Sequence, residues 1–271
     1  MKIRPFILLI LFLSGLLVVL TACGSGDEQT SGQKSEEVEE GSVQQIRVGG
    51  AASTTFAYGF ISSWAETLQN VNDNLNFVIQ ATPGSNVHYE MFEEDKIDMG
   101  AGFAPTEYMA LEGDREPYVG EEFTKFRVIF PTTVSLAHVV TTEDSELETV
   151  QDLEGVNLGV PGRGSSTTLT AAYQLEALGV SPNFVYAQPD EMRNMLQDGR
   201  IDAFWHYTGA PYSGVLDLAS QINLKFISFT EEDIKKIAEI EPYTSLGYLT
   251  SDHYDFVKED VTTASTYPTV L

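Results

Sequence analysis

Two short loops of this 271-residue chain combine glycine with hydroxyl side chains directly before a predicted helix. They are GGAASTTF (49–56) and PGRGSSTT (161–168). A helix N-terminus presents free N–H groups and the positive end of the helix dipole, and both favour an anion. We therefore expect these loops to bind a small carboxylate through backbone N–H groups and hydroxyls. Capping of the following helix is the alternative use of the same hydroxyls.

The individual candidates are of three chemical kinds. The expected hydroxyl donors are Thr54, Thr55, Ser165, Ser166 and Thr167. Arg163, which lies between Gly162 and Gly164, has the geometry to bind a carboxylate with two parallel hydrogen bonds, or it faces solvent. Three aromatic residues are candidates for the walls of a cleft, with a plain core position as the alternative: Phe56, Phe103 and Tyr207.

The sequence offers little support for an enzyme or a metal site. His88 and His206 have no carboxylate or second histidine at a ligand spacing, so we interpret them as hydrogen-bonded structural residues. A hydrolase would need an activated nucleophile, and neither GSGDE (24–28) nor GRGSS (162–166) forms the Gly-x-Ser-x-Gly turn. We predict no catalytic residue, no metal and no cofactor, and an enzyme remains the rival class.

The elements that must position these loops alternate between strand and helix. Periodicity predicts strands over 46–48, 76–80, 97–103, 127–141, 184–187, 201–207 and 224–229, and one ending at 160. It predicts helices over 56–69, 86–94, 167–178, 191–198 and 231–239, and a short one ending at Gly155. This order is typical of α/β domains with a largely parallel sheet, in which small ligands bind beyond the carboxyl ends of the strands.

The only cysteine, Cys23, follows a segment typical of a secretory signal peptide. Lys2 and Arg4 give a positive end, and the apolar run 6–20 is short for a membrane span. Leu-Thr-Ala-Cys (20–23) resembles the lipobox of bacterial lipoproteins, which implies cleavage before Cys23 and lipidation of its sulfur. An ordinary signal peptide with an incidental cysteine is the alternative.

Residues after Cys23 have the composition of a flexible acidic tether. The stretch 24–45 is rich in Gly, Ser, Gln and Glu and almost lacks apolar side chains, so it cannot bury enough surface to offset its ordering entropy. We therefore expect a signal peptide over 1–22, a lipidated cysteine with its tether over 23–45, and a globular part from 46 onward.

The net charge of the chain argues against two classes of binding partner. Fifteen basic and 40 acidic residues give a formal net charge of −25. This excess of negative charge argues against nucleic acid and against direct adhesion to anionic lipid. An acidic surface keeps a protein soluble at high salt, so we also infer a saline or alkaline habitat.

Four motifs in a fixed order suggest a family. They are ASTTFAYG (52–59), PGS (83–85) followed by a helix and IDMG (97–100), PGRGSST (161–167), and IDAFWHYTGAP (201–211). Together they resemble the TAXI family, the solute receptors of tripartite ATP-independent periplasmic (TRAP) transporters. The similarity runs from about Ile46 to the C-terminus. Such receptors normally continue for several dozen further residues that complete the first lobe, so we expect that lobe to be incomplete here.

The resemblance implies a bilobal, periplasmic-binding-protein-like (type II) fold, with the ligand in the cleft between two α/β lobes. The ligand residues that it implies, beside those named above, are Ala52, Ser53, Ser85, His88, Gly164, Thr208 and Gly209. Several differ from the family pattern. Ala52 and Ser53 replace loop glycines, Phe56 replaces a tyrosine, His88 replaces an asparagine and Arg163 replaces a serine.

The resemblance also implies an organisation and a role. We expect lobe one over 46–138 plus 235–271 and lobe two over 139–234, with crossings near 138–141 and near Phe229. Ligand binding would close the two lobes about this hinge. The protein would be a monomer, anchored outside the cell membrane through Cys23, that delivers a glutamate-like acid or another carboxylate to TRAP membrane subunits. The alternatives are a receptor for an ABC-type importer and a ligand-sensing lipoprotein without a transport role.

Overall fold

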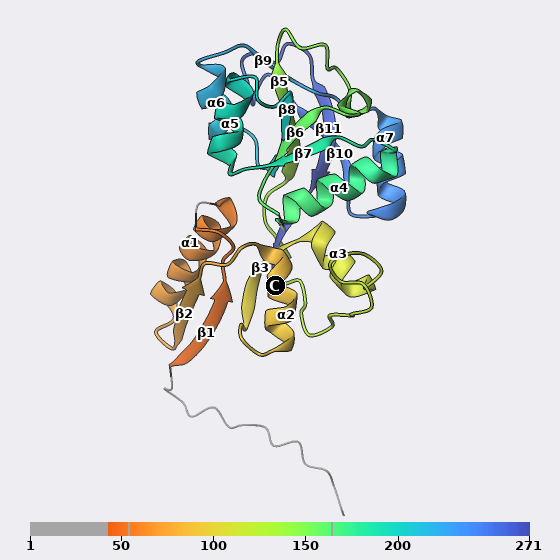
Figure 1. The fold of residues 1–271 in the computed structure, drawn as a ribbon. Helices are drawn as coiled ribbons and strands as arrows, with labels where there is room; N and C mark the ends of the chain where they lie inside the picture. The colour runs from red at the N-terminus through yellow and green to blue at the C-terminus, as the bar shows by residue number, and fades with distance from the viewer. Residues whose placement is uncertain (1–42, 54, 164) are drawn as a thin grey trace, which may run out of the picture. The chain divides into compact units, whose positions relative to one another are not determined.

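The structure is a computed structural model that describes residues 43–53, 55–163 and 165–271. These residues form two β-sheets with flanking helices (Figure 1). The predicted signal peptide over 1–22, Cys23, the tether up to residue 42, Thr54 and Gly164 lie outside the described residues. The first strand begins at Gln44, two residues before the predicted start of the globular part at 46.

The first sheet has five strands in the order β2-β1-β3-β12-β4. Their bounds are β1 (Gln44–Gly49), β2 (Leu75–Gln80), β3 (Met99–Phe103), β4 (Phe130–Pro131) and β12 (Pro268–Val270). Strand β1 pairs in parallel with β2 and β3, whereas β12 runs antiparallel to β3 and β4. The associated helices are α1 (Phe56–Val71), the 3-10 turn η1 (Ser85–Val87), α2 (His88–Glu93) and α3 (Ala104–Glu112). We call this sheet and its helices the first lobe.

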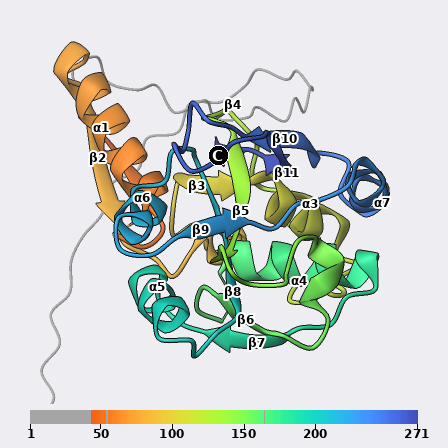
Figure 2. The same cartoon turned by 90° about the horizontal axis from the view of Figure 1, so that it is seen from above.

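Local sequence explains the start of this lobe. Helix α1 buries Ile61 and Ala65 and packs along β2, which Figures 1 and 2 show from two sides. Phe60 and Trp64 cover the same small core, which also contains Val48 and Phe77. The helical spacing of apolar residues therefore predicted α1 correctly.

The second sheet has seven strands in the order β10-β11-β5-β8-β6-β7, with β9 paired to β5. Their bounds are β5 (Ser135–Thr142), β6 (Asn157–Val160), β7 (Asn183–Tyr186), β8 (Ala203–Thr208), β9 (Leu224–Phe226), β10 (Ser245–Leu249) and β11 (Val261–Thr266). The helices are the 3-10 turn η2 (Val150–Leu153), α4 (Ser166–Leu178), α5 (Pro189–Gln197), α6 (Ser213–Ala219) and α7 (Glu231–Ile240). We call this sheet and its helices the second lobe.

Strand β8 shows how both faces of the second sheet are covered. Trp205 and Tyr207 point into a core shared with α4 and α7, while Phe204 points into a core shared with α5 and α6. Successive side chains of a strand face opposite sides, so a continuous apolar run such as IDAFWHY is required where helices cover both faces.

Two adjacent segments connect the lobes. Residues 132–134 lead from β4 to β5, and Tyr267 leads from β11 to β12. The Thr132 N–H donates to the Pro268 carbonyl at 2.8 Å, so the two crossings lie side by side. The expected crossings near 138–141 and Phe229 were wrong, because 138–141 lie inside β5 and the Phe229 N–H donates to Thr262, which is in β11.

The expected division of the C-terminal part also needs correction. The resemblance predicts that residues 235–271 belong to the first lobe, but β10 and β11 pair antiparallel with each other and β11 pairs with β5 of the second sheet. Helix α7 packs on this second sheet as well. Only β12 returns to the first sheet. The first lobe therefore comprises about 44–131 plus 268–271, and the second lobe comprises about 135–266.

Candidate functional site

The loop after β1 uses one of its hydroxyls as a helix cap. Thr55 is the N-cap of α1, where its Oγ1 accepts from the Tyr58 N–H at 3.4 Å and donates to the Ala52 carbonyl at 2.7 Å. Ala52 is half-buried and Ser53 is exposed. Thr55 therefore caps the helix, as the alternative interpretation predicted, and the Ser53 side chain remains accessible to a ligand.

The loop after β6 is built in the same way. Ser165 is the N-cap of α4, and its Oγ accepts from the Thr168 N–H at 3.1 Å and donates to Thr168 Oγ1 at 2.9 Å. Ser166 and Thr167 occupy the first turn and are half-buried. The hydroxyl of Ser165 is therefore committed to the helix, while its two neighbours lie at the positive end of the α4 dipole.

A third loop from the other lobe reaches this helix start. Ser85 opens η1 after the turn 83–84, and its hydroxyl oxygen lies 2.6 Å from that of Ser166. Only 6% of the Ser85 surface is exposed. The structure thus brings together one predicted loop of each lobe through a direct hydrogen bond between two serines.

Arg163 stacks on an aromatic ring that no sequence motif indicated. Its guanidinium carbon lies 4.1 Å from the centre of the Tyr186 ring, at the end of β7, and the side chain is exposed. Among the described residues, no hydrogen bond or ion pair engages this guanidinium. Stacking occupies the face of the guanidinium but leaves its N–H edge available for an anion.

Two of the predicted aromatic residues meet where the lobes join. The rings of Phe103, at the end of β3, and Tyr207, near the end of β8, lie 5.7 Å apart in an edge-on arrangement. Both are nearly buried, at 7% and 6% exposure. Phe56, by contrast, is 53% exposed and packs against Phe60 on α1. Phe103 and Tyr207 are therefore core residues in this structure, as the alternative interpretation predicted.

His88 is part of the scaffold beneath the loops. It is fully buried, its Nδ1–H donates to the Ala101 carbonyl at 2.7 Å, and its Nε2 accepts from the Thr82 hydroxyl at 2.7 Å. Burial lowers the pKa of His88 to about 4, so the imidazole is neutral near pH 7. Both nitrogens are engaged within the protein, which agrees with a structural histidine rather than a metal ligand.

The last predicted pair lies beside the crossing segments. Thr208 ends β8 and pairs with Leu136 on β5. Gly209 follows, and a Cβ built on it would lie 3.9 Å from Thr133 and Val134. These residues therefore border the segments that connect the two lobes.

Further contacts between the lobes surround α3, and no sequence motif indicated them. The Tyr243 hydroxyl donates to the Pro105 carbonyl at 3.1 Å, and its ring lies 5.5 Å from that of Tyr108. The Tyr173 hydroxyl donates to the Glu116 carbonyl. Isolated tyrosines carry no local signal of such long-range partners, so only the fold reveals them.

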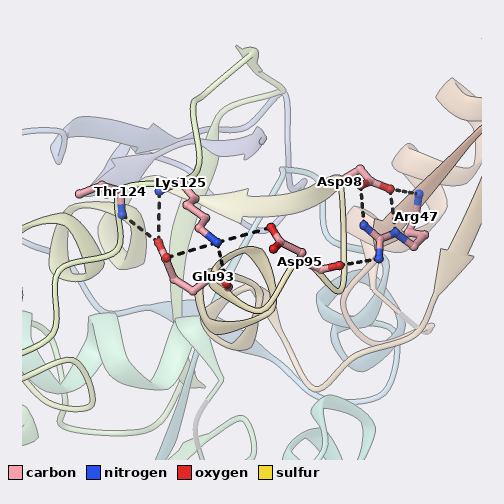
Figure 3. Close-up of polar contacts among 6 residues, drawn as sticks. All are labelled: Arg47, Glu93, Asp95, Asp98, Thr124 and Lys125. Atoms are coloured by element: carbon pink, nitrogen blue, oxygen red, sulfur yellow. Dashed lines mark hydrogen bonds and ion pairs between the residues drawn. The ribbon is translucent and has the colours of Figure 1, made fainter. Parts of the chain in front are cut away.

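Five charged side chains on the surface of the first lobe pair with one another in two groups (Figure 3). Arg47 binds Asp98 at 2.6 Å, and the Lys125 ammonium reaches Glu93 and Asp95 at 3.9 and 3.4 Å. The hydrogen bond from Arg47 lowers the pKa of Asp98. These carboxylates are satisfied by the protein and need no ligand.

Other kinds of site find little support in the described part of the chain. There, no three His, Cys, Asp or Glu residues gather closely enough to hold a metal ion. Across residues 43–53, 55–163 and 165–271, no helix combines the length and apolarity needed to cross a membrane. An open polar hollow of about 370 Å³ lies between α5 and α6, lined by residues such as Arg193 and Asp217, away from the predicted loops.

Two α/β lobes joined by two adjacent crossings, with hydroxyl-rich loops at the strand ends, define the bilobal periplasmic-binding-protein fold that the sequence predicted. The chain belongs to the NMT1-like family, whose model matches residues 46–270.

A solved structure with a TM-score above 0.5 supports this fold. The GluR0 ligand-binding core in complex with L-glutamate is 13% identical, with a TM-score of 0.51 over 85% of this chain and 86% of that one. The probable amino-acid ABC transporter extracellular-binding protein ytmK from Bacillus subtilis is 15% identical, with a TM-score of 0.46 and 84% of each chain covered. The aliphatic sulphonate binding protein SsuA from Escherichia coli is 17% identical, with a TM-score of 0.45 over 68% of this chain. This chain spans 60% of the length of SsuA.

Proposed function

We propose that this protein is an extracytoplasmic solute-binding lipoprotein that captures a small organic anion, either a glutamate-like amino acid or another carboxylate. One observation carries the proposal. The Ser85 hydroxyl of the first lobe lies 2.6 Å from the Ser166 hydroxyl of the second lobe, at the N-terminus of α4. Loops that meet across two lobes at a helix dipole suit a ligand held from both sides.

The chemistry of the surrounding residues supports an anion. Arg163 stands on the Tyr186 ring with its N–H edge available, and Thr167 lies in the first turn of α4. Ser53 offers an exposed hydroxyl from the first lobe. A carboxylate bound here would accept hydrogen bonds from a guanidinium, from hydroxyls and from helix N–H groups. Ala52, Phe56, Thr208 and Gly209 would complete the rim of the site.

The N-terminal sequence and the resemblance to TAXI receptors support a cellular role. The signal peptide and Cys23 would place the protein outside the cell membrane with a lipid anchor, and the acidic tether would let the lobes reach a partner. The protein would act as a monomer and deliver its ligand to the membrane subunits of a TRAP-type transporter, as the resemblance to TAXI receptors implies. Binding, rather than catalysis, would be its whole activity.

A thermal-shift screen of the mature protein tests the ligand class. The panel should contain L-glutamate, L-aspartate, shorter and longer dicarboxylates, monocarboxylates and the sulfonate taurine, with uncharged sugars as negative controls. A ligand at 100 times its Kd stabilises the folded state by about 2.7 kcal/mol. We expect at least one carboxylate to raise the melting temperature, and Arg163→Ala to reduce that shift. No shift with any acid would contradict the proposed anion.

A further inference from the structure

A buried chain of hydrogen bonds runs from the junction of the lobes into the second lobe. The Tyr207 hydroxyl donates to Gln174 Oε1 at 2.9 Å, and Gln174 Nε2 donates to Glu241 Oε2 at 2.7 Å. The Thr244 hydroxyl donates to the same Glu241 oxygen at 3.1 Å. Gln174 and Glu241 have no exposed surface, and Thr244 has 4%.

The carboxylate sets the direction of the whole chain. An ionised carboxylate only accepts hydrogen bonds, so in its ionised form Glu241 requires the NH₂ group of Gln174 to face it. The Gln174 carbonyl oxygen must then face Tyr207, which obliges the Tyr207 hydroxyl to donate. An apolar residue at position 241 would leave Gln174 free to rotate, and the hydroxyl of Tyr207 would lose its fixed partner.

The burial of Glu241 lowers the stability of the fold, which indicates a role other than stabilisation. Burying a carboxylate without a full set of partners is unfavourable, and Glu241 Oε1 has no hydrogen-bond partner among the described residues. Burial raises the pKa of Glu241 to about 7. The charged and titratable groups around it are Arg115 from the segment after α3, Tyr243 from the segment before β10, and Tyr207 from β8.

At its other end the chain reaches the first lobe. The ring of Tyr207 meets Phe103 edge-on at 5.7 Å, at the carboxyl ends of strands from both sheets. We propose that Glu241 is a positioning residue of the ligand site, which acts through Gln174 to hold the Tyr207 phenol against Phe103 where the two lobes meet. The inference rests on the proposed function, because it assumes that a ligand bound between the two lobes depends on how Tyr207 and Phe103 meet.

Tyrosine NMR tests the chain without any ligand. The protein is labelled with ζ-¹³C-tyrosine, and the Tyr207 signal is assigned by its loss in Tyr207→Phe. We expect this signal to shift with pH around a midpoint of about 7, where Glu241 titrates, since burial keeps Tyr207 itself protonated. Glu241→Gln keeps an oxygen that accepts from Gln174. In this variant the Tyr207 signal should stay within the range of its wild-type positions and no longer move with pH.

Two control variants make this result specific. Glu107 also has a pKa raised to about 7 by burial, so Glu107→Gln must leave the Tyr207 titration intact. Glu239→Gln, at an exposed position of α7, must also leave it intact. A Tyr207 signal that does not move in the wild type, or that still titrates in Glu241→Gln, would overturn the proposal.

Ligand affinity provides the second arm. With the acid that gives the largest thermal shift, Glu241→Leu should weaken binding at least threefold, and Glu241→Gln should bind within twofold of the wild type. Equal affinity in all three proteins would overturn the positioning role. If no acid binds, the proposed function fails, and the Tyr207 titration still decides whether Glu241 orders this chain.

Discussion

The hydroxyl oxygens of Ser85 and Ser166 lie 2.6 Å apart although the two residues belong to different lobes. Ser85 opens the turn before α2, and Ser166 begins α4. A solute that enters between these loops must replace this hydrogen bond or extend it. In the proposed site, this pair would therefore couple ligand binding to the arrangement of the lobes.

Removal of either hydroxyl should weaken ligand binding. We expect Ser85→Ala and Ser166→Ala each to reduce affinity by about 1 kcal/mol, the usual value of one hydrogen bond. The double variant should lose less than the sum, because neighbouring groups that share a partner are not additive. Calorimetric titration of the best acid from the panel measures all three values. Ser181→Ala, at an exposed loop position, is the control, and unchanged affinity in both single variants would contradict this assignment.

The contact between Tyr243 and α3 should favour the arrangement in which the lobes touch. Tyr243→Phe removes the hydroxyl that donates to the Pro105 carbonyl and keeps the ring against Tyr108. We expect a larger radius of gyration in small-angle scattering without ligand and a several-fold weaker affinity. Tyr248→Phe, at a 46% exposed position, should change neither quantity. A Tyr243→Phe protein with wild-type scattering and affinity would show that this contact does not hold the lobes.

Gly49 is required by the histidine beneath the first loop. A Cβ at position 49 would lie 2.6 Å from His88 Nε2, and His88 is buried with both nitrogens engaged. Gly49→Ala should therefore reduce the free energy of unfolding by about 1–3 kcal/mol, as overpacking does. Gly59→Ala, in α1 with open space around it, should instead stabilise by about 0.5–1 kcal/mol. Urea denaturation distinguishes these opposite signs, and equal effects would contradict the packing argument.

Glu241 should make stability depend on pH in a defined direction. Burial raises the pKa of Glu241 in the folded state from 4.5 to about 7. The folded protein therefore binds more protons than the unfolded chain between these values, and its stability falls as pH rises through them. Relative to the wild type, Glu241→Gln should gain about 3 kcal/mol between pH 4.5 and pH 7, since one pKa unit corresponds to 1.36 kcal/mol.

The control for this pH effect is Glu239→Gln on the exposed side of α7. Its free energy of unfolding should follow the wild-type curve at every pH. Burial lowers the pKa of three histidines, so their contribution makes stability rise with pH below pH 6.5, opposite to the effect of Glu241. The quantity to measure is therefore the difference in the free energy of unfolding between variant and wild type, not the wild-type slope alone. A difference that stays constant with pH would contradict the assignment to Glu241.

Elements with strong local signals were predictable from the sequence. The helices after 49–55 and 161–165 begin within a residue of their predicted starts, because Thr55 and Ser165 are good N-caps and apolar spacing follows each. The strand expected over 127–141 is instead divided into β4 and β5 by the crossing at 132–134. That division depends on pairing between Thr132 and Pro268, which are 136 residues apart, and no local pattern contains it.

The candidate site was predictable only in part, for the same reason. The sequence selected the serine loops, and the fold joins Ser85 to Ser166. The sequence could not show that Thr55 and Ser165 cap their helices, because capping and anion binding favour the same residue types. Tyr186 lies beneath Arg163 only because β6 and β7 pair in parallel and end together.

A crystal structure of the protein with the acid that gives the largest thermal shift tests the central claim most directly. The account predicts that the carboxylate lies between the Ser85 turn and the start of α4, within hydrogen-bond distance of Ser166 and the Arg163 guanidinium. An acid found elsewhere, for example in the hollow between α5 and α6, with the bond between Ser85 and Ser166 unchanged, would contradict it.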